Sequence, residues 1–337
     1  MKLAQVLMVS LMVLATFCLS AYSTSICENP QSEKDVRLAT EEIVKRLMRM
    51  RKSDWTWDAV ITPIVFQVSV PKMFFGREKT ARSFVKKIKK NFDRMSLGQK
   101  AENIIAIKSL CMNERNIGGI DLVKNVSEEL KLQFPNNTRF PAIGYGMFSI
   151  GIGSVCVSGY PIENWLFEKF ISGQNEDGSF GDSNHLMNTI RLLPPTHCLR
   201  LMQNPAYNVT TLDNVILKMR EYIMKNIITT RAGELYIENK FLTSLALIGL
   251  WKTKSEGENP DKWRCKELSK TLGIYPDPNE TLFHLTYRLM RLHGSAFLDV
   301  ASPEFTCQKP DPIPKGYVPS CKPHKPWTCK SKDPDPK

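Results

Sequence analysis

Apolar residues recur at helical spacing along most of the chain, and short polar breaks separate one such segment from the next. This periodicity predicts about twelve helices. They lie at 34–51, 55–70, 78–95, 98–112, 118–133, 141–158, 161–173, 184–203, 210–228, 238–252, 261–273 and 280–293. In chain order, the even-numbered segments carry less charge, and their centres recur roughly every 45 residues. Paired in this way, the segments predict an all-α fold, an α6/α6 barrel whose apolar helices form the inner ring.

The stretch 160–182 shows how two neighbouring helices are joined. Its first half carries an apolar face at helical spacing, from Ile162 to Phe170. The pair Asp177-Gly178 then favours a tight turn, and Phe180 is placed to pack back onto the helix ends. A second apolar helix follows, and this helix–turn–helix unit resembles the turns of α/α toroids.

Prolines interrupt two of the apolar segments. Pro63 falls inside 55–70, and Pro194-Pro195 falls inside 184–203. A proline in a helix interior removes a backbone hydrogen bond and clashes with the preceding turn. We therefore expect kinked or split helices at both places.

The first residues of the chain have the features of a secretory signal peptide. Lys2 precedes an apolar run, and small residues follow it, so cleavage is expected between Ser20 and Ser25. Removal of Cys18 leaves eight cysteines, an even number that predicts disulfides in an oxidising compartment. The predicted location is secreted and extracellular. Four glycosylation sequons agree with that location: Asn125, Asn136, Asn208 and Asn279.

The helical pattern stops after Asp299. Residues 307–337 hold eight prolines and three cysteines, a composition that cannot build a core of its own. Cys321 and Cys329 are candidates to close a small loop there. The expected organisation is a signal peptide at 1–23, a barrel domain at 24–306 and an irregular Pro/Lys-rich tail at 307–337.

Residues 140–162 carry no charge, and their number would suffice to span a bilayer. A helix that is apolar on all sides is either a membrane span or a buried core helix. Sequons lie on both sides of this stretch, so a span would place one pair of them in the cytosol. We therefore favour the buried helix and expect no membrane span.

The net charge is +12, and basic residues gather early in the chain, above all at Lys86–Lys90. A solvated helix face is the simplest interpretation of this run. A patch for an anionic, heparin-like surface is the alternative, whereas nucleic acid is not expected as a partner outside the cell.

The sequence offers few groups for catalysis. The five histidines are scattered without an HExxH motif, so a zinc site is not expected, and neither a GxSxG motif nor a phosphate loop occurs. Some α/α barrels are glycosidases that use two carboxylates. The loop acids Glu176 and Asp182, or Asp54 and Asp58, are the candidates for such a pair, although loop acids usually cap helices. A ring with an apolar interior instead suggests a seat for a ligand, and we predict a protein that is not an enzyme.

Several short motifs recur in the order of one known family. They are Gly98-Gln99 leading to Ser109-Leu110-Cys111, Tyr145–Gly151 leading to Cys156, Asn188-Thr189 leading to Cys198-Leu199, Gly233–Tyr236 with Thr243–Leu247, Lys262–Lys266, and Gly294–Val300 leading to Cys307. Together they resemble the α-domain of the cobalamin carriers, the family of intrinsic factor, transcobalamin and haptocorrin. The similarity extends over about 27–310, and the six cysteine positions make it fairly specific.

The resemblance implies both the disulfides and the ligand. The implied pairs are Cys27–Cys265, Cys111–Cys307 and Cys156–Cys198. The implied ligand is cobalamin or a related corrinoid, which such carriers hold between an α6/α6 barrel and a β-rich domain. The residues carried over as ligand-binding are Gln99, Tyr145, His185, Asn188, Asn239 and Tyr287. His185 lies near the histidine that binds cobalt in transcobalamins, although an ordinary loop histidine is the simpler interpretation.

The chain departs from the family pattern at several of these positions. Asn188 stands where the family usually has aspartate, Tyr287 stands where it has glutamine, and Ile248 replaces a polar residue. Each lost neutral hydrogen bond would weaken binding by about 1 kcal/mol. No β-domain sequence follows Cys307, so tight binding is expected to need a separate β-domain chain; a cell-surface receptor is a further expected partner. The alternatives are a diverged helical-barrel binding or interaction protein and, less favoured, a glycan-active enzyme.

Overall fold

The computed structural model describes residues 26–27, 33–50, 57–71, 77–134, 144–202, 204, 207–278, 280–301 and 305. Within these ranges the chain is built almost wholly from helices, which confirms the all-α prediction. The α-helices there are α2 (Glu33–Met50), α3 (Trp57–Ser69), α4 (Arg77–Asn91), α5 (Leu97–Ser109), α6 (Leu122–Gln133), α7 (Tyr145–Val157), α8 (Asn164–Ile171), α9 (His185–Leu201), α10 (Val209–Lys225), α11 (Lys240–Lys252), α12 (Cys265–Leu272) and α13 (Leu282–Leu292). Each predicted segment overlaps one of these helices.

Shorter elements complete this part of the chain. Three are 3₁₀ helices: η2 (Phe92–Arg94), η4 (Pro260–Trp263) and η5 (Phe297–Ala301). The strands β1 (Ile228–Thr229) and β2 (Leu235–Tyr236) form a small antiparallel hairpin between α10 and α11, pairing Ile228 with Tyr236. The sequence did not predict this hairpin or η5.

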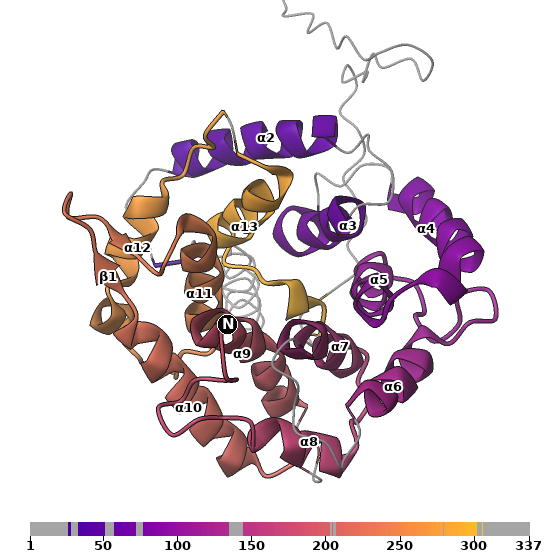
Figure 1. Cartoon of the computed structure of the whole chain (residues 1–337). Coiled ribbons are helices and arrows are strands. Elements are labelled where there is room, and N and C mark those ends of the chain that lie inside the picture. Colours follow the sequence, from indigo (N-terminus) through magenta and orange to yellow (C-terminus); the bar gives the residue numbers. More distant parts are fainter. Residues whose placement is uncertain are drawn as a thin grey trace, which may run out of the picture.

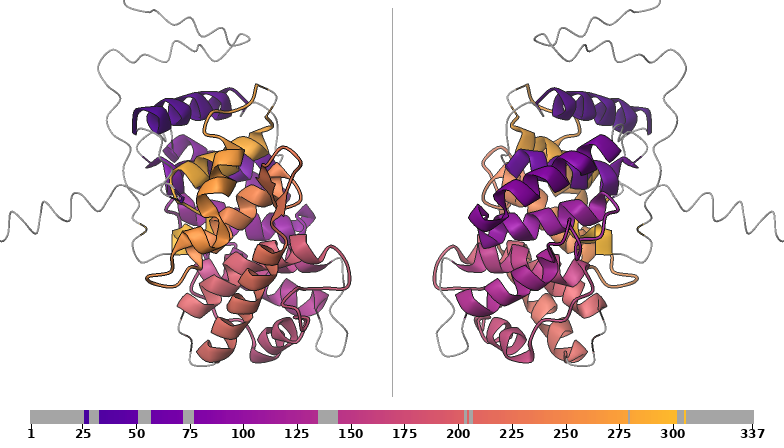
Figure 2. Two further views of the ribbon diagram at one scale, coloured as in Figure 1. Left: turned by 90° about the vertical axis from the view of Figure 1, so that its left-hand side faces the viewer. Right: turned by 90° about the vertical axis from the view of Figure 1, so that its right-hand side faces the viewer.

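Alternate helices form a central ring, which Figure 1 shows in end view. We call α3, α5, α7, α9, α11 and α13 the inner helices; each contacts the next, and α13 contacts α3, so the contacts close a cycle. The outer helices α2, α4, α6, α8, α10 and α12 lie around them, and the side views of Figure 2 show the two sets packed against each other.

Composition explains which helices lie inside. The inner helix α7 has no charged residue and is buried along most of its length, because helices surround it. The outer helix α4 buries Phe84 and Ile88 on one face and exposes Lys86, Lys89 and Lys90. Charged and uncharged segments therefore alternate along the sequence because outer and inner helices alternate in the fold.

The inner helices have their N-terminal ends on one side of the ring. Near the beginnings of α5 and α7, a Cβ on Gly98 would lie 3.0 Å from Sδ of Met147. Near the beginnings of α11 and α13, the rings of Phe241 and His284 are 6.2 Å apart. Since early residues meet early residues, these helices run parallel, and their positive dipole ends gather on the same side.

The opposite side of the ring is filled by the segment after α13. The helix η5 contacts α3, α5, α7 and α9, and Figure 1 shows it inside the ring. Asp299 pairs with Lys252 at the end of α11 at 2.8 Å, and the hydroxyls of Ser295 and Ser69, the last residue of α3, are 2.6 Å apart. This segment therefore fills the C-terminal end of the inner ring.

Kinked or split helices were expected at the prolines, and the structure excludes a split at either place. Helix α3 runs through Pro63, and α9 runs through Pro194 and Pro195. In a regular helix the backbone N–H of residue 195 would donate to the carbonyl of Arg191. Here the hydroxyl of Ser149, on the neighbouring helix α7, donates to that carbonyl at 2.6 Å. Tertiary packing thus replaces a hydrogen bond that proline removes.

The uncharged stretch 140–162 contributes a buried inner helix, as favoured. Helix α7 covers Tyr145–Val157 and packs between α5 and α9. Gly151 permits close contact with α6, because an added Cβ there would lie 2.8 Å from Leu130. Among the described residues, every helix is too short or too polar to cross a bilayer.

Two of the expected disulfides are confirmed. Cys27–Cys265 joins the segment before α2 to the start of α12, and Cys156–Cys198 joins the inner helices α7 and α9. Cys111 is also disulfide-bonded, while its expected partner Cys307 lies outside the described residues. The predicted signal peptide at 1–23, the tail at 307–337 with Cys321 and Cys329, and Asp54 lie outside them as well.

Candidate functional site

The turn between α8 and α9 folds over the N-terminal end of the inner ring. Gln174 and Phe180 form a β-bridge, and the backbone N–H of Asn175 donates to the carbonyl of Ser179 at 2.8 Å. Phe180 is fully buried, with its ring stacked 5.3 Å from that of Phe170, so its predicted packing onto the helix ends is confirmed. Gln174 also donates to the carbonyl of Val215, which fixes the turn to α10.

Tyr145 lies beneath this turn, at the first position of α7. It is buried, and its ring is 6.1 Å from that of Phe180 in an edge-on arrangement. A Cβ on Gly173 would lie 3.0 Å from the Tyr145 hydroxyl, and one on Gly181 would lie 2.9 Å from its ring. Tyr145 therefore supports the turn from below.

His185 begins α9 beside the same turn and is half-buried. Its Nδ1 is 3.4 Å from the Ser179 hydroxyl, which donates to the carboxylate of Asp177 at 2.7 Å. The hydrogen bonds from the hydroxyl and backbone N–H of Ser179 lower the pKa of Asp177, and His185 adds to this effect. If Nδ1 carries the proton and donates to Ser179, Nε2 keeps a lone pair that can bind a metal.

Asn188 lies one turn after His185 and is buried. Its Nδ2 donates to the carbonyl of Ser183 at 2.9 Å and to that of Phe180 at 3.3 Å. An aspartate could not donate to these carbonyls. Asparagine at this position therefore has a structural role in holding the turn, in addition to any contact that its Oδ1 makes with a ligand.

Gln99 and Asn239 lie at the beginnings of two other inner helices. Gln99 forms a capping box with Ser96, whose backbone N–H donates to Oε1 of Gln99 at 3.0 Å. Asn239 is the N-cap of α11, and its Oδ1 accepts from the backbone N–H of Leu242 at 2.9 Å. Both side chains are exposed, so the amide N–H groups of Asn239 remain available at this end of the ring.

Tyr287 lies deeper, in the middle of α13. It is buried, and its ring makes edge-on contacts with Phe241 at 5.4 Å and with Phe297 of η5 at 5.3 Å. Burial raises the pKa of its hydroxyl far above the usual range. Tyr287 therefore fills space within the ring, where a smaller side chain would leave a hollow.

The structure thus brings three of the six predicted residues together. Tyr145, His185 and Asn188 meet around the turn 174–183, since Gly181 approaches both Tyr145 and Asn188. Gln99 and Asn239 lie at the same end of the ring as these three residues but belong to other helices. Tyr287 belongs to an aromatic cluster deeper in the ring. The expected axial ligand, His185, is the one member of the group with an imidazole.

Two charged residues of the inner helices were missed by the sequence reasoning. Arg191 of α9 is exposed, makes no ion pair with a described residue, and would have its guanidinium 3.1 Å from a Cβ on Gly146 near the start of α7. The positive charge of Arg191 lowers the pKa of Tyr287, and the negative charge of Glu102 on α5 raises it. The sequence does show that each of these charged residues lies within a largely apolar segment. It does not show which face of the helix carries the charge, because that depends on how the helices pack.

The alternative acids do not form a described site. Glu176 and Asp182 are both exposed in the turn, and no cluster of three metal-binding side chains occurs among the described residues. Of the sequons, Asn208 is exposed and caps α10, whereas Asn125 is half-buried with an enclosed Oδ1. Asn136 and Asn279 lie outside the described residues, and glycosylation stays a prediction.

Replacing Gly181 by alanine is expected to destabilise the protein by about 2–4 kcal/mol. Gly181 has φ of +88°, and an added Cβ would lie 2.8 Å from Nδ2 of Asn188. Gly233→Ala is the matched control, because Gly233 has φ of +79° with no atom within 4 Å of the added Cβ, so it should cost only about 1 kcal/mol. Urea unfolding measures both; equal losses would show that the crowding at Gly181 is unimportant.

Comparison with known proteins identifies the family. The model of the family described as eukaryotic cobalamin-binding protein matches residues 8–325. Comparison with individually curated proteins gives no match. The match covers nearly all of the chain, including the turn around His185 and every inner helix. The chain therefore belongs to the family of eukaryotic cobalamin-binding proteins, as the resemblance of its motifs predicted.

Proposed function

We propose that this protein is a secreted carrier that binds a corrinoid, such as cobalamin, at the N-terminal end of its inner helices. The observation that carries the proposal is the arrangement at the turn 174–183. There a histidine, a buried asparagine and a buried tyrosine lie on the side of the ring that η5 does not fill. Membership of a cobalamin-binding family supports the class of ligand.

The polar groups at this end suit a ligand with amide side chains. Asn239 offers amide N–H groups, because only its Oδ1 is used in capping the helix. Arg191 adds a cation beside α7, which suits a phosphate or carbonyl oxygen of the ligand. The backbone N–H groups at the helix ends favour acceptor atoms in the same place. The protein would thus hold the ligand without performing chemistry on it.

His185 is the residue we assign to the cobalt of the corrinoid. The hydrogen bonds His185–Ser179–Asp177 can fix the imidazole with its proton on Nδ1, which is the tautomer that leaves Nε2 as a ligand. The carboxylate at the end of this series also increases the electron-donating power of the ring.

Purified protein mixed with cyanocobalamin is expected to retain it through gel filtration at close to one ligand per chain. The retained ligand absorbs visible light, so protein and cobalamin are measured in the same fraction. Heat-denatured protein is the control for nonspecific adsorption. Protein that elutes without visible absorbance after incubation at stoichiometric concentration would contradict the proposal.

The role of His185 is tested with aquocobalamin, whose bound water is exchangeable. Binding to the wild type is expected to shift the visible spectrum as nitrogen replaces water on cobalt, and His185→Ala is expected to bind without this shift. His284→Ala is the control, since His284 also lies in the first turn of an inner helix. A spectral shift that persists in His185→Ala would assign the ligand atom elsewhere.

Secretion is the second part of the proposal. The confirmed disulfides support it, because such bonds persist in oxidising compartments. The receptor and the separate β-domain chain expected from the family pattern remain proposals of the same kind. Expression in a eukaryotic cell tests secretion directly, since the protein should accumulate in the medium with its disulfides intact.

A diverged binding or interaction protein is the second candidate, and one observation favours it. Tyr287 fills the interior of the ring together with Phe241 and Phe297, which reduces the space for a large ligand. The exposed lysines of α4 would then offer a surface for an anionic partner. This candidate predicts that the protein does not retain cobalamin and that it binds heparin in a salt-sensitive way. The carrier proposal predicts that the protein retains cobalamin through gel filtration.

A further inference from the structure

A buried arginine without a counter-ion lies between α12 and α13. Arg291 is 2% exposed, and its guanidinium donates to the Ser269 hydroxyl at 2.9 Å and to the carbonyl of Gly273. Its Nε is also enclosed and has no hydrogen-bond partner. All of these acceptors are uncharged, and burial lowers the pKa of Arg291 to about 9, with the nearby charge of Arg288 adding to the effect. Arg291 therefore forms no ion pair among the described residues, and the nearby carboxylate of Glu280 offsets only part of the effect of burial on its pKa.

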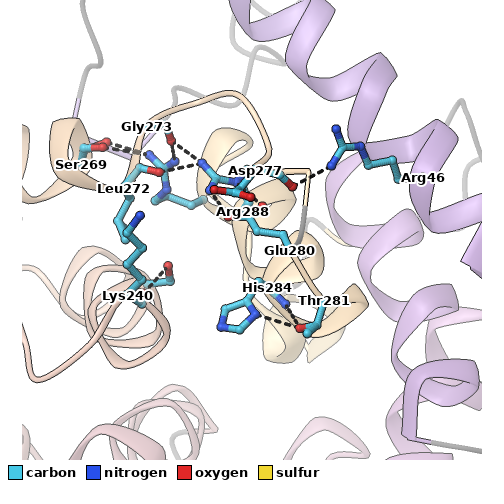
Figure 3. Close-up of polar contacts among 12 residues, drawn as sticks. Arg46, Lys240, Ser269, Leu272, Gly273, Asp277, Glu280, Thr281, His284 and Arg288 are labelled. Atoms are coloured by element: carbon cyan, nitrogen blue, oxygen red, sulfur yellow. Dashed lines mark hydrogen bonds and ion pairs between the residues drawn. The ribbon is translucent and has the colours of Figure 1, made fainter.

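The surrounding charges leave an excess of cations. Arg288 forms an ion pair with Glu280 and donates to the carbonyl of Leu272 at 2.7 Å, so these two charges neutralise each other. Lys240, at the first position of α11, forms no ion pair with a described residue. Figure 3 shows Lys240 on one side and Glu280, His284 and Arg288 on the other. With Glu280 cancelled by Arg288, Arg291 and Lys240 contribute two unopposed positive charges.

These residues surround a small cavity. Polar and charged residues line it (Lys240, Ser244, Glu280, His284, Arg288 and Arg291) together with the apolar or aromatic residues Phe241, Leu272 and Tyr287. The cavity volume is about 10 Å³, which is enough for one particle of the size of a water molecule. A phosphate or carboxylate group is too large for it, whereas a monatomic anion is not.

We propose that this cavity binds one monatomic anion of the halide class, with chloride as the form present in extracellular fluid. A water molecule in the cavity would leave the buried charge without a counter-charge, which is costly in a medium of low dielectric constant. A halide in the cavity places a negative charge beside Arg291 and Lys240 and neutralises one of the two positive charges. The site is separate from the turn at His185 and does not depend on the corrinoid proposal.

Bromide diffraction tests the site in the wild-type protein. Crystals of the full chain soaked in sodium bromide are expected to give an anomalous peak in the cavity beside Arg291. A cavity without an anomalous peak, in which the density refines as water, would overturn the proposal. This measurement needs no variant, so it does not depend on whether a mutant folds.

Thermal unfolding tests the same site in solution. At constant ionic strength, replacing gluconate by chloride is expected to raise the Tm of the wild type by about 2–4 °C, because only the smaller anion fits. Lys240→Ala is expected to raise the chloride concentration for half of this effect about tenfold, or ~1.4 kcal/mol. Lys225→Ala, an exposed lysine at the end of α10, is the control and should behave as the wild type.

The same titration gives the results that contradict a halide site. An equal rise of Tm in gluconate and chloride would show that the cavity has no preference for a halide. Identical titrations of Lys240→Ala and Lys225→Ala would show that Lys240 does not act on the anion. Arg291→Met should abolish the chloride dependence if it folds, and cobalamin retention should be the same in chloride and gluconate for the wild type.

Discussion

Replacing Cys27 and Cys265 together by serine is expected to lower the free energy of unfolding by about 5 kcal/mol. The bond links residues that are 238 positions apart, so it closes most of the chain into one loop. In the chain-entropy account, a loop of this length restricts the unfolded state by about 5 kcal/mol at 25 °C. Both cysteines are buried, and each serine adds a hydroxyl in an apolar place, so the loss should not fall below that value.

The second disulfide provides the matched comparison. Cys156 and Cys198 are 42 positions apart, so the same account gives about 4 kcal/mol for their replacement by serine. Urea unfolding of both double variants, followed by the circular dichroism of the helices, measures the two losses. If the shorter loop proves as costly as the longer one, or costlier, the packing of α7 against α9 rather than chain entropy determines the stability.

The helices could be predicted because each has a strong local signal. An outer helix such as α4 alternates buried and exposed positions, and an inner helix such as α7 lacks charge altogether. The ends also have local causes: Ser96 and Asn239 accept from backbone N–H groups of the helices that follow them. These features depend on neighbouring residues alone, and a sequence shows them directly.

The errors of prediction have a common cause, which is contact between distant residues. Pro195 does not break α9, because Ser149 on another helix satisfies the carbonyl that proline leaves free. The helix η5 was not expected, because it is stabilised by the inner helices around it rather than by its own short sequence. Neither contact has a signal within a window of one helix.

The candidate site was predicted in part for the same reason. Family motifs pointed to His185, Asn188 and Tyr145, and all three lie in the first turns of inner helices. They did not reveal that Nδ2 of Asn188 holds the turn, or that Tyr287 packs against Phe297 of η5. The function of a polar residue depends on which of its atoms remain available after folding, and that is known only from the structure.

Acid is expected to destabilise the protein by about 4 kcal/mol between pH 7.5 and pH 5, because two histidines are held neutral. Burial lowers the pKa of His197 to about 4, with Arg200 and Lys252 adding to the effect, and burial lowers the pKa of His293 to about 4. In the unfolded chain both titrate near 6.5. The unfolded state therefore binds more protons below pH 6.5, so stability falls as the pH decreases from about 6.5 towards 4.

The size of the effect follows from the two pKa values. At pH 5 each histidine is almost fully protonated in the unfolded chain and mostly neutral in the folded one, which costs about 2 kcal/mol for each. His197→Gln and His293→Gln are each expected to remove half of the pH dependence, and the double variant should have a nearly flat curve over this range. Measuring above pH 5 avoids the main titration of the carboxylates. Urea unfolding at several pH values tests this, and an undiminished slope in the double variant would show that other groups bind the protons.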